Sequence, residues 1–153
     1  MSIESKVLGQ QVAYPTDYCP SILVPVPRSL NREIYDIHTP EELFRGFDTW
    51  HAYEAGFLTR NGLPVCGVLK LVYPANSPCI VESKSLKLYL NSLNMTRLGE
   101  DIPSGIETYL QTVKSDLEQI LQTRVEATFF RQTLEKPYFD FQDYTLLEAT
   151  PGI

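Results

Sequence analysis

The chain has 153 residues, of which 43% are hydrophobic and 21% are charged, and these proportions are ordinary for one globular domain. A net charge of −6 argues against direct binding of nucleic acid or of an anionic membrane surface. The sequence has no apolar run near the ~20 residues of a membrane span and no signal-peptide pattern at its start. Three irregularly spaced cysteines, Cys19, Cys66 and Cys79, fit reduced thiols. We therefore expect a cytoplasmic protein.

Residues 1–47 are expected to form an irregular N-terminal wrap with short extended pieces. Proline restricts the backbone and lacks an amide donor, so five prolines in this stretch disfavour long helices and central strands. A helical turn is expected after Thr39, with Thr39 as the N-cap, Pro40 at the first helical position, and Glu41 and Glu42 in the first turn.

A β-hairpin is predicted next. An aromatic-rich segment over Asp48–Leu58 and a β-rich run over Val65–Tyr73 flank Asn61-Gly62, a strong hairpin signal. Residues 74–78 are expected to form a loop.

Two helices are predicted after the hairpin. Apolar residues recur at helical spacing over Ser83–Asn94 and again over Ser104–Gln122, where Ser104 and Glu107 suggest a capping box. Val125–Arg131 alternates as a third strand, and Tyr138–Leu147 is expected to be a fourth strand or an extended tail.

This order predicts an α+β fold in which two helices pack on one face of an antiparallel sheet. We expect the sheet and helices to occupy residues 48–147, and residues 148–153 to begin a linker.

The cysteines and histidines give little support for a catalytic thiol or a metal centre. Cys66 is expected inside an apolar strand and Cys79 in a loop, and free cysteines usually behave as small buried hydrophobic residues. His38 and His51 have no ligand partners at metal spacing, so no metal is expected.

The segment from Ile80 to Leu90 carries the clearest chemical signal. It places Glu82 and Ser83 at the start of a helix, where backbone amides favour an anion, and Lys84 and Lys87 add positive charge. A carboxylate such as Glu82 can accept two parallel hydrogen bonds from a guanine-type ring. In the plainer alternative, Ser83 caps the helix, Glu82 lies in its first turn, and the lysines are solvated.

The same segment resembles the signature of the NADPH-dependent 7-cyano-7-deazaguanine reductases, the nitrile reductases of queuosine biosynthesis, a tRNA-modification pathway. The matching octapeptide runs from Glu82 to Tyr89, and Val26–Arg32, Gly46–Trp50 and Asn61–Pro64 match the two-module form of the family in the same order. The resemblance covers roughly residues 8–131 and implies a tunnelling fold (T-fold).

The resemblance also implies the chemistry. In this family a cysteine thiolate attacks the nitrile to give a thioimide, an aspartate moves protons, and two hydride transfers from NADPH yield the amine. By matching positions, Val81, Glu82 and Ser83 would bind 7-cyano-7-deazaguanine, and Ser83 and Lys84 would contact NADPH. No metal is implied.

The catalytic residues do not carry over. Leu58 and Val65 occupy the places of the cysteine and the aspartate, Gly99-Glu100-Asp101 replaces an expected His-Glu pair, and Phe130-Arg131-Gln132 replaces an arginine turn. In the two-module form of the family, the second module carries the cysteine, the aspartate, the second substrate glutamate and the arginine turn. We therefore expect this chain to be the N-terminal module, as a fragment or a separate subunit, and to be inactive alone.

Three interpretations follow. In the first, the chain completes its site with a C-terminal catalytic module or assembles as a homo-oligomer. In the second, it is a non-catalytic T-fold that binds a purine- or pterin-like ring or only assembles with a partner. In the third, it is a self-sufficient reductase that uses Cys66 or Cys79 in a displaced role.

Overall fold

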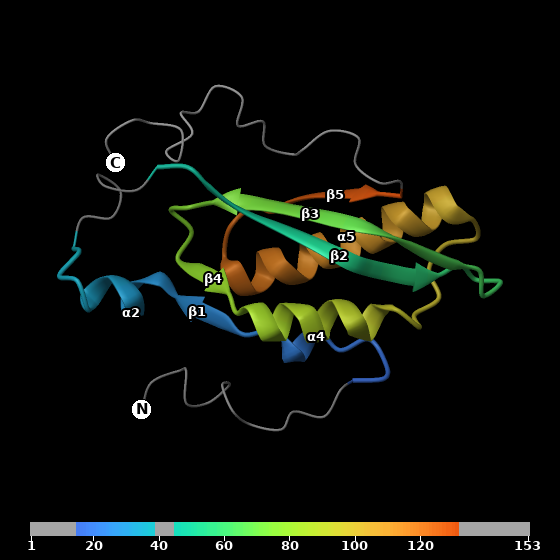
Figure 1. The fold of residues 1–153 in the computed structure, drawn as a ribbon, viewed down its shortest axis with the longest axis horizontal. Coiled ribbons are helices and arrows are strands. Elements are labelled where there is room, and N and C mark those ends of the chain that lie inside the picture. The colour runs from blue at the N-terminus through green and yellow to red at the C-terminus, as the bar shows by residue number, and fades with distance from the viewer. Residues whose placement is uncertain (1–14, 39–44, 132–153) are drawn as a thin grey trace, which may run out of the picture.

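The structure is a computed structural model that describes residues 15–38 and 45–131 (Figure 1). The expected helical turn at residues 39–42, the expected strand or tail at residues 138–147 and the expected linker at residues 148–153 lie outside the described residues. In chain order the elements are η1 (Pro20–Ile22), β1 (Pro25–Pro27), α2 (Arg28–Glu33), β2 (Phe47–Leu58), β3 (Pro64–Pro74), β4 (Cys79–Val81), α4 (Ser83–Leu93), α5 (Ile102–Leu121) and β5 (Glu126–Phe130).

The larger sheet contains the predicted hairpin and the predicted third strand. Its order among the described strands is β2-β3-β5, and both pairings are antiparallel. The register of β2 against β3 shifts between Ala52 and Ala55, which leaves a bulge at Tyr53 and Glu54. A bulge bends a strand and redirects its side chains, and here it lies beside the groove described below.

The hairpin turn is longer than the two-residue turn that Asn61-Gly62 usually forms. The amide of Gly62 donates to the Thr59 carbonyl at 2.8 Å, and the amide of Leu63 donates to the Thr59 hydroxyl at 3.1 Å. Only Gly62 of the pair has a positive φ, at 85°. The buried Thr59 therefore organises the turn, and Gly62 supplies the left-handed residue that closes it.

A second, smaller ladder joins β1 to β4 and was not predicted from the sequence. The two strands pair antiparallel, with Val26 opposite Ile80. Residues 74–78 were expected to form a loop, and Cys79 was placed in it, but Cys79 lies in β4 opposite Pro27. Short strands rich in proline carry no alternation signal, so their pairing depends on a segment far away in the sequence.

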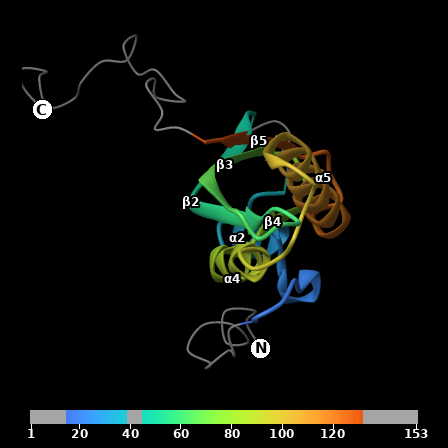
Figure 2. The ribbon, with the colours of Figure 1, turned by 90° about the vertical axis from the view of Figure 1, so that its right-hand side faces the viewer.

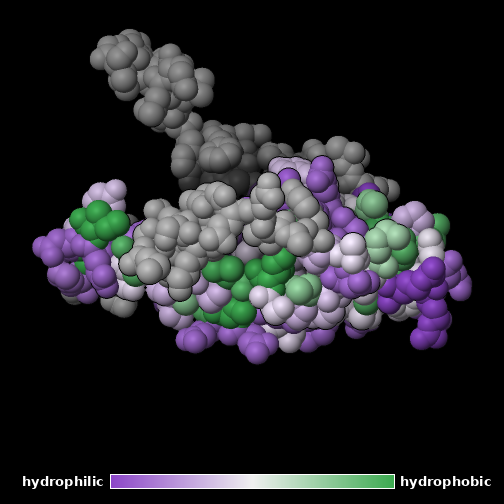
Figure 3. Space-filling view, turned by 90° about the horizontal axis from the view of Figure 1, so that it is seen from below, coloured by the Kyte–Doolittle hydropathy of each residue, from purple (hydrophilic) through white to green (hydrophobic). Residues whose placement is uncertain are grey.

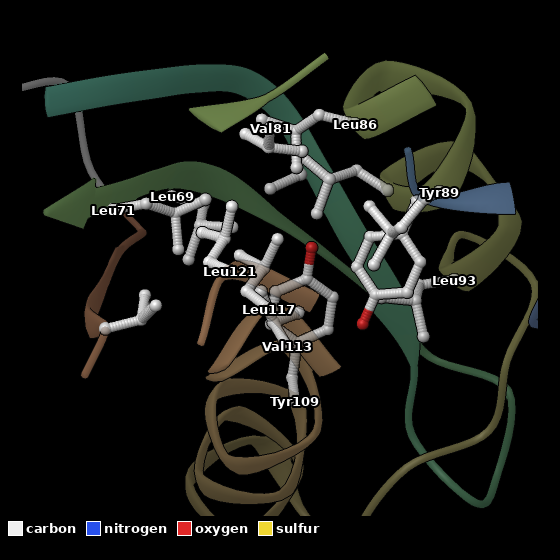
Figure 4. Close-up of a cluster of buried hydrophobic side chains, with 14 of the residues drawn as sticks. Leu69, Leu71, Val81, Leu86, Tyr89, Leu93, Tyr109, Val113, Leu117 and Leu121 are labelled. Atoms are coloured by element: carbon white, nitrogen blue, oxygen red, sulfur yellow. The ribbon is translucent and has the colours of Figure 1, made fainter. Parts of the chain in front are cut away.

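The two long helices pack on the same face of the larger sheet and build the core (Figure 2). In α5 the fully buried side chains are Tyr109, Val113, Leu117 and Leu121, one stripe at helical spacing. Figure 4 shows this stripe meeting Tyr89 and Leu93 of α4 and Leu69 and Leu71 of β3. The structure confirms the predicted α+β arrangement of two helices on one face of an antiparallel sheet.

The predicted capping box of α5 was placed three residues too late. The helix starts at Ile102, and its N-cap is Asp101, whose carboxylate accepts the Ser104 amide at 2.9 Å. Ser104 in turn receives the Asp101 amide at 3.2 Å, so Ser104 completes the box and Glu107 takes no part in it. The pattern of box residues occurs twice here, and spacing alone does not select between them.

On the visible part of the side that carries α4 and η1, apolar side chains gather near the middle, and hydrophilic side chains surround them (Figure 3). The most exposed large hydrophobic side chains are Ile34 and Tyr35, just after α2, followed by Phe47, Tyr53 and Met95. Two of these, Phe47 and Tyr53, lie on β2. No helix among residues 15–38 and 45–131 is long and apolar enough to cross a membrane.

Candidate functional site

Glu82 lies between β4 and α4 and is the N-cap of the helix. Its carboxylate accepts the amide of Lys84 at 2.9 Å through Oε1 and the amide of Ser85 at 2.7 Å through Oε2. The exposed Ser83 hydroxyl also donates to Oε1, at a longer distance of 3.4 Å. These bonds fix both oxygens, and since a carboxylate accepts about four hydrogen bonds, the remaining acceptor capacity lies mainly on Oε2. Glu82 is partly buried, so the fixed carboxylate can still be reached.

This arrangement corrects two expectations about the helix start. Ser83 is not the N-cap, since the cap is Glu82. The amides of Lys84 and Ser85 donate to the Glu82 side chain, so they do not offer an open anion site. An external phosphate would have to compete with a carboxylate already held by two charge-assisted hydrogen bonds.

The neighbouring candidate residues lie close to Glu82 with different exposure. Val81 is buried, with 2% of its surface exposed, and ends β4. Ser83 is exposed and lines a groove, whereas Lys84 is half-buried and is not among the groove residues. Lys87, one turn along α4, lines that groove. The candidate residues are neighbours in sequence, and the structure divides them between the held carboxylate and the groove.

Ser85 holds Glu82 in place, and the sequence analysis gave it no role. Its hydroxyl donates to the Glu82 carbonyl at 2.8 Å and accepts the Val24 amide at 3.1 Å. The Glu82 amide donates back to the Val24 carbonyl at 3.0 Å. The N-terminal segment therefore braces the start of α4. A serine inside a helical pattern carries no sequence signal for such a distant contact.

The groove has a volume of about 370 Å³ and lies between the bulged part of β2 and α4. Residues 50–54 of β2 form one wall, and Ser83, Leu86, Lys87, Leu90 and Asn91 of α4 form the other. Aromatic, apolar, amide, hydroxyl, imidazole and cationic groups are therefore gathered at one place, together with the carboxylate of Glu54. This composition fits a nucleotide, whose planar rings and phosphates need those contacts.

Trp50 and His51 are two partly buried residues of β2 in the groove wall. The indole Nε1–H of Trp50 donates to the Tyr73 hydroxyl at 2.9 Å. Burial, and next to it the positive charge of Lys70, lower the pKa of His51, so the neutral imidazole is favoured at the groove. The sequence analysis considered His51 only as a metal ligand and Trp50 only as part of longer segments such as Gly46–Trp50, because an isolated aromatic residue or histidine has no motif of its own.

No cysteine is among the residues that line the groove. Leu58 and Val65 pair near the end of the hairpin, where Leu58 lies opposite Pro64 and Val65 opposite Phe57. Val65 is buried and Cys66 is exposed, which confirms that Cys66 points to the opposite side of the strand. The expectation that Cys66 is a buried residue is wrong, since Cys66 lies on the face of β3 turned away from the helices.

Among the described residues, no cluster of three or more histidine, cysteine or acidic side chains could hold a metal ion. His38 pairs with Asp36 at 2.6 Å on the surface, and His51 lies in the groove wall. The two histidines therefore lie in different parts of the fold.

The sequence model of one protein family, described as "Nitrile reductase, 7-cyano-7-deazaguanine-reductase N-term", matches residues 14–129. The chain belongs to this family. The match contains the whole larger sheet except Phe130, together with both long helices. Its fold is therefore the α+β tunnelling fold that the resemblance implied.

Two relatives illustrate how far the similarity extends, and both are named NADPH-dependent 7-cyano-7-deazaguanine reductase. The relative from Acinetobacter baumannii (strain ATCC 17978) is 39% identical over 131 residues, which are 86% of this chain and 46% of that protein. The relative from Legionella pneumophila (strain Corby) is 35% identical over 146 residues, which are 95% of this chain and 47% of that protein. The chain spans about half the length of the curated relatives it matches.

Proposed function

We propose that this chain is the N-terminal, ligand-binding module of an NADPH-dependent 7-cyano-7-deazaguanine reductase, which forms the 7-aminomethyl product of the queuosine pathway. The observation that carries the proposal is the Glu82 carboxylate, held by two amides at 2.9 and 2.7 Å with lone pairs still open. The names of the relatives supply the reaction, and a C-terminal module supplies the nucleophilic cysteine.

Glu82 recognises the ring through the open position on Oε2 and through the position on Oε1 that the exposed Ser83 hydroxyl, 3.4 Å away, vacates when the ring binds. The ring N–H and the exocyclic NH₂ of a deazaguanine present two parallel donors, which match the two oxygens of one carboxylate. The helix amides hold that carboxylate in one orientation before the ligand arrives, so little side-chain freedom is lost on binding. Val81 and Ser83, on either side of Glu82, border the ring.

The groove beside Ser83 holds part of NADPH, which supplies hydride when bound. Ser83 and Lys87 offer a hydroxyl and a positive charge to its phosphates, and Lys84 adds charge next to Ser83. The amides at the helix start donate to Glu82, so the phosphates are bound by side chains.

The proposal is tested by calorimetric titration of 7-cyano-7-deazaguanine into the full chain, with and without the second half of the Acinetobacter relative. The Glu82→Gln variant should weaken binding about 10- to 100-fold, because its amide group presents a donor to a donor edge of the ring. Asp101→Asn is the matched control, because it alters the other acidic helix cap away from the groove. Its affinity should equal that of the unmodified chain.

Two results would contradict the proposal. If the Glu82 and Asp101 variants bind 7-cyano-7-deazaguanine equally well, Glu82 is not part of the site. If the unmodified chain does not bind 7-cyano-7-deazaguanine, alone or with the second half of the relative, the proposed function is rejected. NADPH oxidation only after the second half is added would support a divided active site.

A second candidate, a non-catalytic T-fold that binds a purine- or pterin-like ring, is favoured by one observation. No cysteine is among the groove residues, and the place of the nucleophile holds Leu58. Tight binding of the ring together with no NADPH oxidation in the mixture would select this candidate.

A further inference from the structure

Trp50 is the single tryptophan of the chain, and it forms part of the groove wall. Its side chain is half-buried against the core, and its Nε1–H donates to the Tyr73 hydroxyl at 2.9 Å. If the indole rotated, it would break this hydrogen bond to Tyr73, whose side chain is buried. The ring therefore keeps one orientation toward the groove.

The same Tyr73 hydroxyl also contacts the strand that leads to Glu82. It accepts the amide of Val81 at a longer distance of 3.4 Å, and Val81 directly precedes Glu82. Tyr73 is buried, with 1% of its surface exposed, and burial raises its pKa, so the phenol remains neutral. One buried hydroxyl thus links a wall of the groove to the backbone that carries the carboxylate.

We infer that Trp50 packs against a planar ring of the nucleotide bound in the groove, and that Tyr73 is the residue that positions Trp50. The inference rests on the proposed function, which places NADPH in this groove with its phosphates toward Ser83 and Lys87. An aromatic side chain held in a fixed orientation offers a flat apolar surface to a ring at little entropic cost.

The test uses the full chain labelled with ¹⁵N, in which the indole N–H of Trp50 gives one isolated NMR signal. Titration with NADPH should shift this signal as the groove fills. Tyr73→Phe should move the signal in the free protein, because the acceptor is lost, and should weaken NADPH binding about 2- to 10-fold. Trp50→Leu should weaken binding to a similar degree.

Tyr109→Phe is the matched control, because it also removes a hydroxyl from a fully buried tyrosine. Among the described residues that hydroxyl has no hydrogen-bond partner. The variant should leave the Trp50 signal and the NADPH affinity unchanged. If the effect came only from deleting a buried hydroxyl, the Tyr73 and Tyr109 variants would have the same affinity for NADPH.

The outcomes separate this inference from the proposed function. Binding of NADPH without a response of the Trp50 signal, or equal affinities for the Tyr73 and Tyr109 variants, would overturn the inference alone. A signal that moves only with 7-cyano-7-deazaguanine would overturn the assignment of the groove to the nucleotide. Failure of the unmodified chain to bind either ligand, alone or with the second half of the Acinetobacter relative, would overturn both.

Discussion

Arg28 ties together two of the segments that carry the family resemblance. Its guanidinium forms an ion pair with Asp48 at the start of β2, and its Nε donates to the Ser77 carbonyl at 2.9 Å. The Arg28 and Asp48 side chains are only 12% and 26% exposed. This contact joins the segment Val26–Arg32 to the segment Gly46–Trp50 in the folded chain.

Replacing Arg28 with lysine should lower the free energy of unfolding by about 1–3 kcal/mol, because an ammonium group cannot reproduce the fork of donors to Asp48 and Ser77. Urea denaturation measures the change. Arg60→Lys is the matched control, since the Arg60–Glu100 pair is exposed. That control should stay within about 0.5 kcal/mol of the unmodified chain. Equal losses in the two variants would contradict a special role for Arg28.

Single residues also mark where sequence reasoning reached its limit. The position of Glu82 at the start of a helix was predicted correctly, because the helical pattern begins just after it. The role of Glu82 as the cap was assigned to Ser83, because serine is a preferred N-cap residue and glutamate is not. Ser85 and Tyr73 were missed because their partners, Val24 and Trp50, are more than twenty residues away.

At the level of elements, α4 binds the N-terminal segment through two buried serines on one face. Ser85 accepts the Val24 amide at 3.1 Å, and Ser92, two turns later, accepts the Cys19 amide at 3.2 Å. The spacing of seven residues places both hydroxyls on the same side of the helix. The segment from Cys19 to Val24 is thereby anchored at both ends.

Ser85→Ala should destabilise the fold by about 1–3 kcal/mol, because it leaves the Val24 amide without its acceptor. Hydrogen exchange at Val24 should accelerate, while exchange in β3 should change only as far as global stability does. Ser115→Ala, on the exposed face of α5, is the control and should have little effect. An unchanged exchange rate at Val24 would show that Ser85 does not anchor the segment.

The elements that were predicted correctly are those with a strong internal period. The hairpin, α4, α5 and β5 carry their signal in the alternation or the helical stripe of their own side chains. The helix α2 and the β1–β4 ladder were missed, since a short element next to prolines gains its stability from the rest of the fold. The bulge at Tyr53 and Glu54 was missed for a similar reason, because it depends on the register of the partner strand.

At the scale of the whole molecule, three tyrosines that contact the helices, the exposed Tyr18 and the buried Tyr89 and Tyr109, link stability to pH. Burial, followed by the hydrogen bond to Asp116, raises the pKa of Tyr18 to about 12. The same two causes raise the pKa of Tyr89, and burial raises that of Tyr109. Tyr18 and Tyr89 both donate to Asp116, at 2.7 and 2.6 Å, which joins the N-terminal segment, α4 and α5.

Stability should therefore fall as the pH rises above about 10, the pKa of an unfolded tyrosine. In that range the unfolded chain has lost tyrosine protons that the folded chain retains, so the unfolded state binds fewer protons, and raising the pH lowers its free energy relative to the folded state. Urea unfolding at a series of pH values between about 8 and 11 measures the slope.

Tyr89→Phe should flatten this slope, because it removes one of the tyrosines with a raised pKa. Tyr35→Phe, at an exposed position, should leave the slope unchanged. A free energy of unfolding that is constant over this range would contradict the prediction.

The sheet order leaves one long edge of β2 without a partner strand among the described residues. Such an edge offers a row of backbone donors and acceptors to any extended chain, and the bulge interrupts that row at Tyr53 and Glu54. The same residues form a wall of the groove. A strand added along β2 would therefore also border the groove. Assembly of the two chains would then enclose the ligand in the same step, and a bound ligand would stabilise the assembled form by mass action.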